Sequence, residues 1–257
     1  MNDTFTILTT SYNNRKYLKD WADSVLAQKY RPLQVVFVDD FSKTRDSDYA
    51  LTLKNKFNKN NIDLVIRRLD KNVGCSSAYR EALSVASGDF FGVLDSDDSL
   101  VVDAVSDIMN IYKERENISY IYTQFSWCNK NLQIQKKGFC KLPQKGLSLL
   151  DSEMSEKTRH CFSHWRTFSR RVEDPMSVFK PGLKSSVDKY MGYRLEEMGV
   201  GSFYDKPCYN YRSEVTGSIT RTSGDQVPTW RKVRRDARVR RNKRKIKTYP
   251  IKLIKHK

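Results

Sequence analysis

One stretch decides the fold, Phe90-Phe91-Gly92-Val93-Leu94-Asp95-Ser96-Asp97-Asp98-Ser99, in which a short apolar run ends in three carboxylates. Such a run is typical of a buried strand in a parallel sheet. Carboxylates crowded at its end repel one another unless a cation lies between them. Asp oxygens suit Mg²⁺ and Mn²⁺, and such a metal commonly binds a nucleotide diphosphate. The stretch therefore predicts a metal–diphosphate site, although Asp and Ser clusters also form ordinary turns and helix caps.

Three earlier strand-like segments also end in polar side chains. These segments are residues 5–10, 34–38 and 64–66. The helix-like segments between the strands are residues 17–26, a polar stretch that ends near residue 58, and residues 76–87. This alternation predicts right-handed βαβ units and a parallel sheet. Ligands of such sheets bind beyond the carboxyl ends of the strands, so we expect the polar clusters that follow the four strands to meet on one rim.

The second half of the chain has a less regular pattern. Its recognisable segments are a strand at residues 118–128, a helix at 187–198 and a short strand at 208–212. Neither a G-x-G-x-x-G motif nor a Walker A motif occurs, so standard dinucleotide and P-loop sites are not indicated. We expect one α/β domain over residues 1–224, in which residues 1–100 bind a nucleotide and residues 101–224 bind the acceptor.

The net charge of +17 is concentrated at the C-terminus. Residues 225–257 contain 14 Lys and Arg against two Asp, so the rest of the chain carries only +5. We expect this basic extension either to be solvated or to lie on an anionic membrane surface. Nucleic-acid binding is less favoured, because base-stacking aromatic side chains are sparse there. The side chains available for shallow membrane contact are Trp230, Ile246, Tyr249, Ile251, Leu253 and Ile254.

Cysteine usage and hydropathy indicate the compartment. The five cysteines are an odd number without metal-ligand spacing, which favours reduced thiols. The first ten residues lack the pattern of a signal peptide, and no apolar run approaches the roughly 18 residues of a membrane span. We therefore expect a cytoplasmic protein, either free or bound peripherally at the inner face of a membrane.

The motifs after the four strands, taken together, resemble the family 2 glycosyltransferases, which are inverting enzymes of the GT-A fold. The matching motifs are Thr9-Thr10-Ser11-Tyr12-Asn13, Val38-Asp39-Asp40-Phe41-Ser42, Asn72-Val73-Gly74 and Leu94-Asp95-Ser96-Asp97-Asp98. The resemblance implies a Rossmann-like, mostly parallel sheet flanked by helices. It also implies metal-assisted transfer of a sugar from a UDP-linked donor to an acceptor hydroxyl, on a glycan or a lipid-linked saccharide.

The resemblance implies particular contacts to the donor and the metal. Asp40 would accept a hydrogen bond from the imide N–H of uracil. Asp97 would bind Mn²⁺ or Mg²⁺, which neutralises charge on the leaving diphosphate. Asp95 would face the ribose or a metal-bound water. The other implied donor contacts are Thr10, Tyr12, Asn72 and Ser96.

Weaker matches imply the acceptor side of the site. Asp188 would be the general base that takes the proton of the acceptor hydroxyl, although Val187 stands where the family usually has a further acid. The stretch His164-Trp165-Arg166 would line the acceptor or diphosphate side. Arg212 would replace a His of the family's closing loop, where this chain has Glu214 before Gly217-Ser218-Ile219-Thr220.

Each implied role has a structural alternative. Asp39 and Asp40 could cap the segment that follows them, and Asp98 could cap a helix that begins near Val102. Asp188 could be an acid favoured by the dipole of a helix N-terminus. At the level of function, the alternatives are a glycan- or nucleotide-binding protein without turnover and a nucleotidyltransferase. The Gly-rich, Arg-containing loop that nucleotidyltransferases usually carry after their first strand is absent from this sequence.

Overall fold

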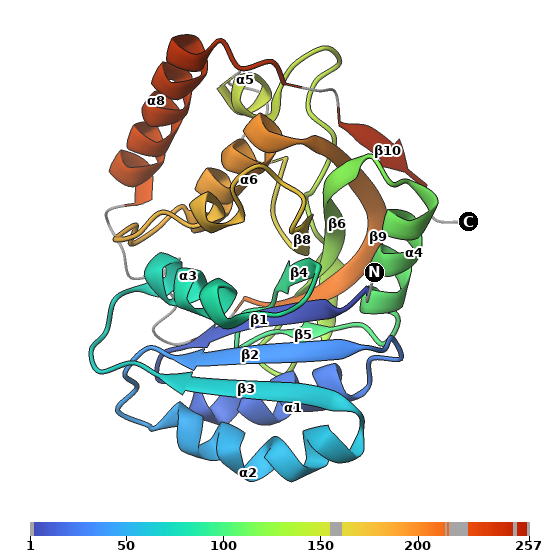
Figure 1. The fold of residues 1–257 in the computed structure, drawn as a ribbon, viewed down its shortest axis with the longest axis vertical. Coiled ribbons are helices and arrows are strands. Elements are labelled where there is room, and N and C mark those ends of the chain that lie inside the picture. Colours follow the sequence, from blue (N-terminus) through green and yellow to red (C-terminus); the bar gives the residue numbers. More distant parts are fainter. Residues whose placement is uncertain (1–2, 155–160, 214, 216–225, 249–250, 256–257) are drawn as a thin grey trace.

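The computed structural model describes residues 3–154, 161–213, 215, 226–248 and 251–255. The chain folds around one mixed, mostly parallel sheet that is flanked by helices (Figure 1). The strand order is β10-β9-β6-β8-β4-β1-β2-β3. The strands on this path are β1 (Phe5–Ser11), β2 (Leu33–Asp39), β3 (Ile62–Arg68), β4 (Phe90–Val93), β6 (Ile118–Cys128), β8 (Arg166–Ser169), β9 (Val200–Arg212) and β10 (Lys252–Ile254). Two short strands lie off the path, β5 (Ser99–Leu100) against β9 and β7 (Ile134–Lys137) against β6.

The four predicted strands of the N-terminal half form a parallel group in the order β4-β1-β2-β3. They are connected by α1 (Leu18–Leu26), α2 (Asp46–Lys59) and α3 (Cys75–Val85). Because parallel crossovers are right-handed, α1 and α2 cover one face of the strands and α3 covers the other, as Figure 1 shows. Every side chain of β2 is buried, which is the burial that its continuous apolar run predicts.

The C-terminal half extends the sheet with β8, β6 and β9. Its helices are α4 (Ala104–Glu114), α5 (Leu149–Met154) and α6 (Val187–Met198), with a short 3-10 turn at η2 (Pro175–Val178); a similar turn, η1 (Arg15–Tyr17), precedes α1 in the N-terminal half. The sequence predicted β6 and α6 with their observed bounds. It predicted only the last five residues of β9, because Pro207 and charged residues interrupt the apolar pattern of that strand.

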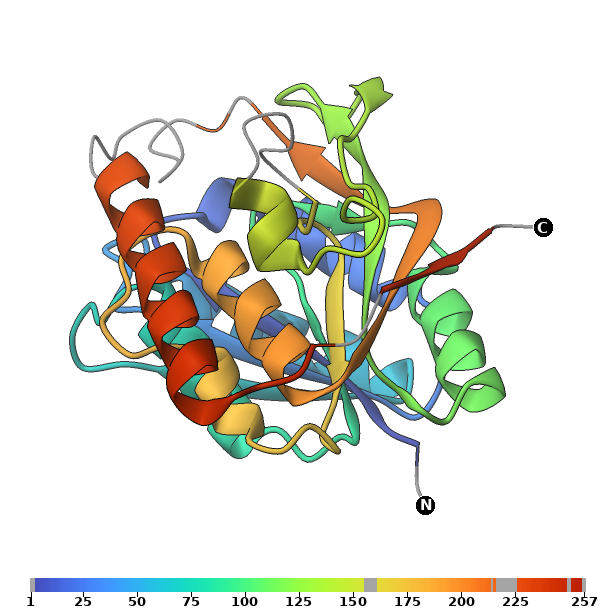
Figure 2. The ribbon, with the colours of Figure 1, turned by 90° about the horizontal axis from the view of Figure 1, so that it is seen from above.

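The basic C-terminal segment is packed against the rest of the protein. Helix α8 (Gln226–Arg244) runs alongside α6, as the two views of Figures 1 and 2 show, and β10 pairs in parallel with β9. Val233 and Ala237 of α8 are buried, and Ile254 of β10 is only 8% exposed. The expectation of a solvated extension is therefore wrong for these residues. Tyr249 lies outside the described residues, and within the described part no helix is long and apolar enough to cross a membrane.

The strand registers bring the polar chain segments of the N-terminal half together. Ser11 at the end of β1 is level with Asp39 at the end of β2, and Asp39 is level with Arg68 at the end of β3. The carboxyl ends of these strands therefore form one edge, which is the place where sheets of this kind bind ligands.

Candidate active site

A cavity of about 1010 Å³ opens at the carboxyl ends of β1, β2 and β4. Residues from both halves of the chain line it, including the start of α6 and the end of β9. Every site residue predicted from the sequence lies in its wall except Trp165. These residues are Thr10, Tyr12, Asp40, Asn72, Asp95, Ser96, Asp97, His164, Arg166, Asp188 and Arg212. The structure thus places them in one site, while their chemical roles stay predictions.

Trp165 lies in the hydrophobic core instead of the cavity. Its side chain is completely buried, and its ring lies 5.5 Å from that of Phe5. His164 and Arg166 line the cavity, while the residue between them is turned into the core. The expected contact between Trp165 and a sugar has no exposed surface on which it could form.

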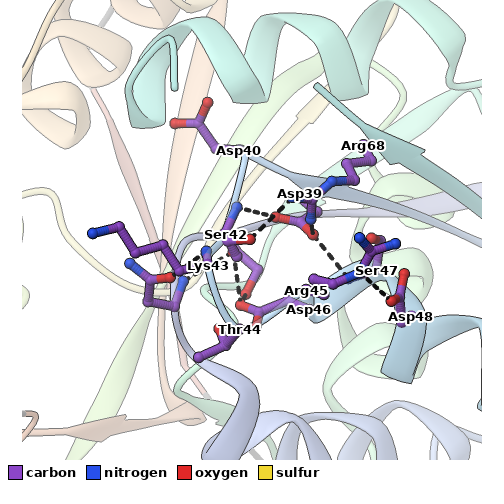
Figure 3. A network of polar contacts seen from close by, with 12 residues as sticks. Asp39, Asp40, Ser42, Lys43, Thr44, Arg45, Asp46, Ser47, Asp48 and Arg68 are labelled. Carbon is purple, nitrogen blue, oxygen red and sulfur yellow. Dashed lines mark hydrogen bonds and ion pairs between the residues drawn. The ribbon is translucent and has the colours of Figure 1, made fainter. Parts of the chain in front are cut away.

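The first acid after β2, Asp39, caps the beginning of α2. Its carboxylate accepts hydrogen bonds from the backbone N–H groups of Ser42, at 2.7 Å, and Ser47, at 3.0 Å (Figure 3). Arg68 forms an ion pair with it at 2.7 Å. The capping alternative is therefore correct for Asp39, whose carboxylate is occupied by these hydrogen bonds and this ion pair.

The second acid, Asp40, points away from that network (Figure 3). Its carboxylate accepts the backbone N–H groups of Val73, at 2.7 Å, and Gly74, at 2.9 Å. Gly74 has a φ of 83°, a conformation that glycine adopts without strain, and α3 begins at the next residue. Burial raises the pKa of Asp40, and these two N–H groups oppose the rise. Asp40 therefore holds the loop before α3 and still faces the cavity, where its remaining lone pairs can accept from a ligand.

The carboxylates of Asp95 and Asp97 differ in how many hydrogen bonds and ion pairs they form within the protein. Asp95 accepts the hydroxyl of Tyr79 at 2.5 Å and pairs with Arg166 at 3.3 Å. Burial opposes ionisation of Asp95, but the charge of Arg166 together with the hydrogen bonds from Tyr79 and Tyr209 outweighs it, and the pKa of Asp95 is lowered. Among the described residues, none donates a side-chain hydrogen bond to the carboxylate of Asp97. Burial, followed by the charge of Asp95, raises the pKa of Asp97 to about 7.

The third acid of the motif, Asp98, is a structural residue. It accepts the hydroxyl of Tyr209 at 2.7 Å and the backbone N–H of Arg212 at 2.6 Å, both from β9. Helix α4 begins after Asp103, so Asp98 does not cap it. The bonds of Asp98 instead tie the acidic loop to the last strand of the C-terminal half.

Arg212 is also committed to contacts inside the protein. Its guanidinium donates to the carbonyl oxygen of Asp97 at 2.7 Å and to the carbonyl of Lys130, and it pairs with Asp20 at 2.7 Å. The arginine thus fixes the backbone of the acidic loop. These contacts use three of its five N–H donors, and its predicted contact with the diphosphate stays a prediction. Glu214 and residues 217–220, which the resemblance assigned to a closing loop, lie outside the described residues.

The acidic loop fits a divalent cation of the kind that the resemblance implies. Asp97 offers oxygen ligands at the cavity wall. Burial and then the charge of Asp95 raise its pKa, and a bound cation would offset both effects. The described residues hold no cluster of three or more His, Cys, Asp or Glu ligands. A metal here would therefore complete its coordination with phosphate oxygens and water, as Mg²⁺ usually does.

The candidate base, Asp188, lies in the first turn of α6 and faces the cavity. Its side chain is half-buried, and none of the residues that the structure describes forms a hydrogen bond with its carboxylate. The neighbouring Lys189 pairs with buried Glu153 at 2.9 Å, which holds the start of the helix in place. The carboxylate is thus held at the wall with its acceptor positions available.

His164 is enclosed by aromatic rings. It stacks on Tyr209 with ring centroids 4.5 Å apart and on Tyr211 at 5.1 Å. Burial, followed by the charge of Arg166, lowers the pKa of His164 to about 3. The imidazole is therefore neutral at physiological pH, with its Nδ1 atom 3.2 Å from Nη2 of Arg166.

Two tyrosines of the site were missed by the sequence analysis. Tyr79 looked like a core residue on the apolar stripe of α3, and Tyr209 looked like an ordinary strand residue. Both hydroxyls reach the acidic loop, where Tyr79 bonds Asp95 and Tyr209 bonds Asp98. A buried tyrosine usually finds a partner for its hydroxyl, which was the available signal, but the partner depends on tertiary packing.

The fold and the cavity define an α/β protein whose ligand site lies at the carboxyl ends of its parallel strands. Residues 6–175 match the family model for glycosyl transferase family 2, and the chain belongs to this family. The resemblance noted in the sequence is thereby confirmed. Because the family consists of glycosyltransferases, a nucleotidyltransferase is no longer an alternative.

The chain is similar to parts of two longer synthases. It is 29% identical over 205 residues to the chondroitin synthase of Pasteurella multocida (strain Pm70). The matched region covers 79% of this chain but 20% of that protein. With the chondroitin synthase of Escherichia coli it shares 26% identity over 204 residues, covering 79% of the chain and 28% of the synthase. The chain thus spans less than a third of the length of either relative.

Solved structures confirm the predicted GT-A fold. Residues 1–349 of S. aureus TarS in complex with UDP-GlcNAc superpose with a TM-score of 0.70 at 19% identity, covering 90% of this chain and 65% of that one. The mannosyltransferase PcManGT from Pyrobaculum calidifontis, in complex with GDP-Man and Mn²⁺, gives a TM-score of 0.59 at 16% identity and covers 95% of this chain and 65% of that one.

Proposed function

We propose that this chain transfers a sugar, with inversion, from a UDP-linked donor to an acceptor hydroxyl on a glycan or a lipid-linked saccharide. One observation carries the proposal: Asp40, Asp97 and Asp188, which come from three separate elements, face a single cavity of about 1010 Å³. The complexes of the structural neighbours with UDP-GlcNAc and with GDP-Man support a nucleotide-sugar donor.

Asp40 is the proposed contact to the base of the nucleotide. Its carboxylate is held rigidly by two backbone N–H groups and keeps acceptor positions for the imide N–H of uracil. Thr10, Tyr12 and Asn72 border it in the cavity wall. Tyr12 is 48% exposed, so its ring can cover a bound base without displacing any part of the core.

Asp97, with Asp95 beside it, is the proposed holder of Mn²⁺ or Mg²⁺. A divalent ion bound there would stabilise the negative charge that develops on the departing nucleoside diphosphate. Arg166 and Tyr79 keep Asp95 ionised and oriented, so its carboxylate can accept a hydrogen bond from the ribose or from a metal-bound water.

Asp188 is the proposed general base. Inverting transfer needs one carboxylate to take the proton of the acceptor hydroxyl as that hydroxyl attacks the anomeric carbon. The Asp188 carboxylate faces the same cavity as the acidic loop, and none of the hydrogen bonds among the described residues occupies it.

The decisive experiment replaces Asp188 by Asn. We expect thermal shifts with UDP and Mn²⁺ to stay as in the unchanged protein, while sugar transfer falls by at least about a hundredfold, the lower end of the range for loss of a general base. Transfer is measured with a panel of UDP-sugars and soluble oligosaccharides. A matched control is Asp151→Asn, which changes an exposed acid of α5 outside the cavity.

Three outcomes separate the alternatives. An unchanged protein that binds UDP with Mn²⁺ but transfers no sugar would be a binding protein without turnover. Full activity in the Asp188→Asn variant would exclude Asp188 as the base. Absence of any thermal shift with nucleotides would contradict the donor assignment itself.

A further inference from the structure

One wall of the cavity is aromatic and has no part in the roles proposed above. Phe125 and Trp127 come from β6, Tyr211 comes from β9, and Phe139 follows β7. Strand pairing brings the first three together, because Phe125 is level with Tyr209, and Trp127 with Tyr211, in the parallel pair β6–β9. Trp165, which the resemblance placed on the acceptor or diphosphate side, is buried, whereas these rings line the cavity.

The rings form a continuous row that begins at His164. Tyr211 stacks on the imidazole with centroids 5.1 Å apart, Trp127 meets Tyr211 edge-on at 5.2 Å, and Phe139 lies 6.4 Å from Trp127. Phe125 supports the row from beneath, since it is 1% exposed and lies 5.5 Å from His164 and 5.1 Å from Phe139. The row is therefore a packed surface with fixed geometry.

The row leads from the acidic loop to solvent. At its inner end, His164 lies 3.2 Å from Arg166, which pairs with Asp95. At its outer end, Phe139 is 43% exposed. A molecule that presents a hydroxyl to Asp188 can thus extend along the row toward the surface, because Asp188 and these rings line the same cavity.

Polar groups accompany the rings. The ammonium group of Lys136 lies 5.2 Å above the ring of Trp127, and Lys184 lines the same cavity. A pyranose has faces of C–H groups and a rim of hydroxyl groups, so it can cover an aromatic ring while its rim meets polar side chains. An alkyl chain would cover the rings equally well but would remove water from the ammonium groups without replacing it.

We propose that Trp127, Tyr211 and Phe139 form an acceptor subsite that binds the saccharide units behind the reacting hydroxyl. The inference rests on the proposed glycosyl transfer and names the substrate class of its acceptor side. The subsite sets how tightly a saccharide acceptor binds, and it has no contact with the reacting atoms.

The test compares Trp127→Ala and Phe139→Ala with the unchanged chain. The probes are tetrasaccharides of chondroitin, hyaluronan and chitin, with UDP-GlcNAc and UDP-glucuronic acid as donors and Mn²⁺ present. We expect Trp127→Ala to raise the acceptor KM about tenfold, as expected for the loss of one aromatic contact, with kcat and the affinity for UDP unchanged. Trp127→Phe keeps a ring and should restore most of the affinity. Ile134→Ala is the matched control, because Ile134 is 66% exposed on the adjacent β7 and lies outside the cavity wall.

Direct binding provides a second measurement that does not depend on turnover. Trp21 and Trp165 are completely buried, and Trp230 lies on α8 outside the cavity wall, whereas Trp127 is partly exposed in that wall. Tetrasaccharides should therefore change the tryptophan fluorescence of the unchanged chain and not that of Trp127→Phe. If UDP binds but no tetrasaccharide does, or if Trp127→Ala leaves the acceptor KM unchanged, the subsite is refuted. Binding of octyl phosphate alone that requires Trp127 would assign the wall to a lipid and also refute it. Failure of UDP to bind would instead refute the proposed function.

Discussion

Neighbouring acids after β2 have different environments in this protein, although nothing in their local sequence separates them. Asp39 is enclosed by Arg68 and the first turn of α2, whereas Asp40 turns to the loop before α3 and to the cavity. The alternation of side chains at a strand end predicts that two successive residues diverge. Which of them meets the cavity depends on where α3 packs, and that is not a local property.

At the residue scale, His164 should make the stability of the protein depend on pH. Its pKa is about 3 in the folded chain and near 6.5 when unfolded. Below pH 6.5 the unfolded chain binds a proton at this side chain that the folded chain does not, and this proton favours the unfolded state. The free energy of unfolding is therefore unaffected by His164 above pH 6.5 and falls as the pH is lowered toward 3. We expect the free energy of unfolding in urea to fall more steeply between pH 6.5 and 4.5 for the unchanged protein than for His164→Phe, by up to about 1.4 kcal/mol per pH unit. Parallel profiles for the two proteins would contradict a neutral imidazole at residue 164 in the folded chain.

At the scale of elements, ion pairs of buried acids connect the C-terminal end of α6 to α8. Its first turn carries Asp188, and its last turns carry Glu196 and Glu197, which are buried. Arg241 of α8 pairs with Glu196 at 2.7 Å, and Arg240 pairs with Glu197 at 2.7 Å. Some of the basic residues of 226–244 therefore pair with two buried acids on another helix. The charge pattern of the segment alone does not predict these pairs.

Removing one arginine from this contact should destabilise the protein. Arg241→Ala leaves Glu196 buried without its charged partner, and breaking a buried pair in this way costs about 3–5 kcal/mol. The matched control is Arg238→Ala on the exposed side of the same helix, which should change the free energy of unfolding by less than about 0.5 kcal/mol. Urea unfolding measures both values. Equal stability of the two variants would show that the α6–α8 pairs contribute nothing.

At the scale of the whole molecule, the C-terminal segment completes the fold. It adds β10 to the edge of the sheet next to β9 and covers α6 with α8 (Figure 2). The outer face of α8 is basic, so attachment to an anionic membrane surface through that face stays a prediction, as does a cytoplasmic location. The exposed basic residues of this face are Arg231, Lys232, Arg235, Arg238 and Lys243.

Deletion of residues 226–257 tests whether the segment belongs to the fold. A solvated extension could be removed without effect, whereas this deletion uncovers α6 and the edge strand β9. We expect the midpoint of thermal unfolding to fall by about 10 °C or more, since each kcal/mol corresponds to about 2–4 °C in a chain of this size. Removal of residues 255–257 alone should leave the midpoint unchanged, because exposed Lys255 follows the last strand. An unchanged midpoint for the longer deletion would mean that the segment does not stabilise the domain.

The sequence by itself determined the N-terminal βαβ units, the helix at 187–198 and the polar motifs at the strand ends, because local periodicity and turn chemistry specify these features. Tertiary structure alone decided that Trp165 is buried and that the aromatic surface belongs to Trp127, Tyr211 and Phe139. It also decided that the basic C-terminus packs on α6. These outcomes depend on strand pairing and on charges far apart in the chain, and such contacts leave no periodic signal in the segments that make them.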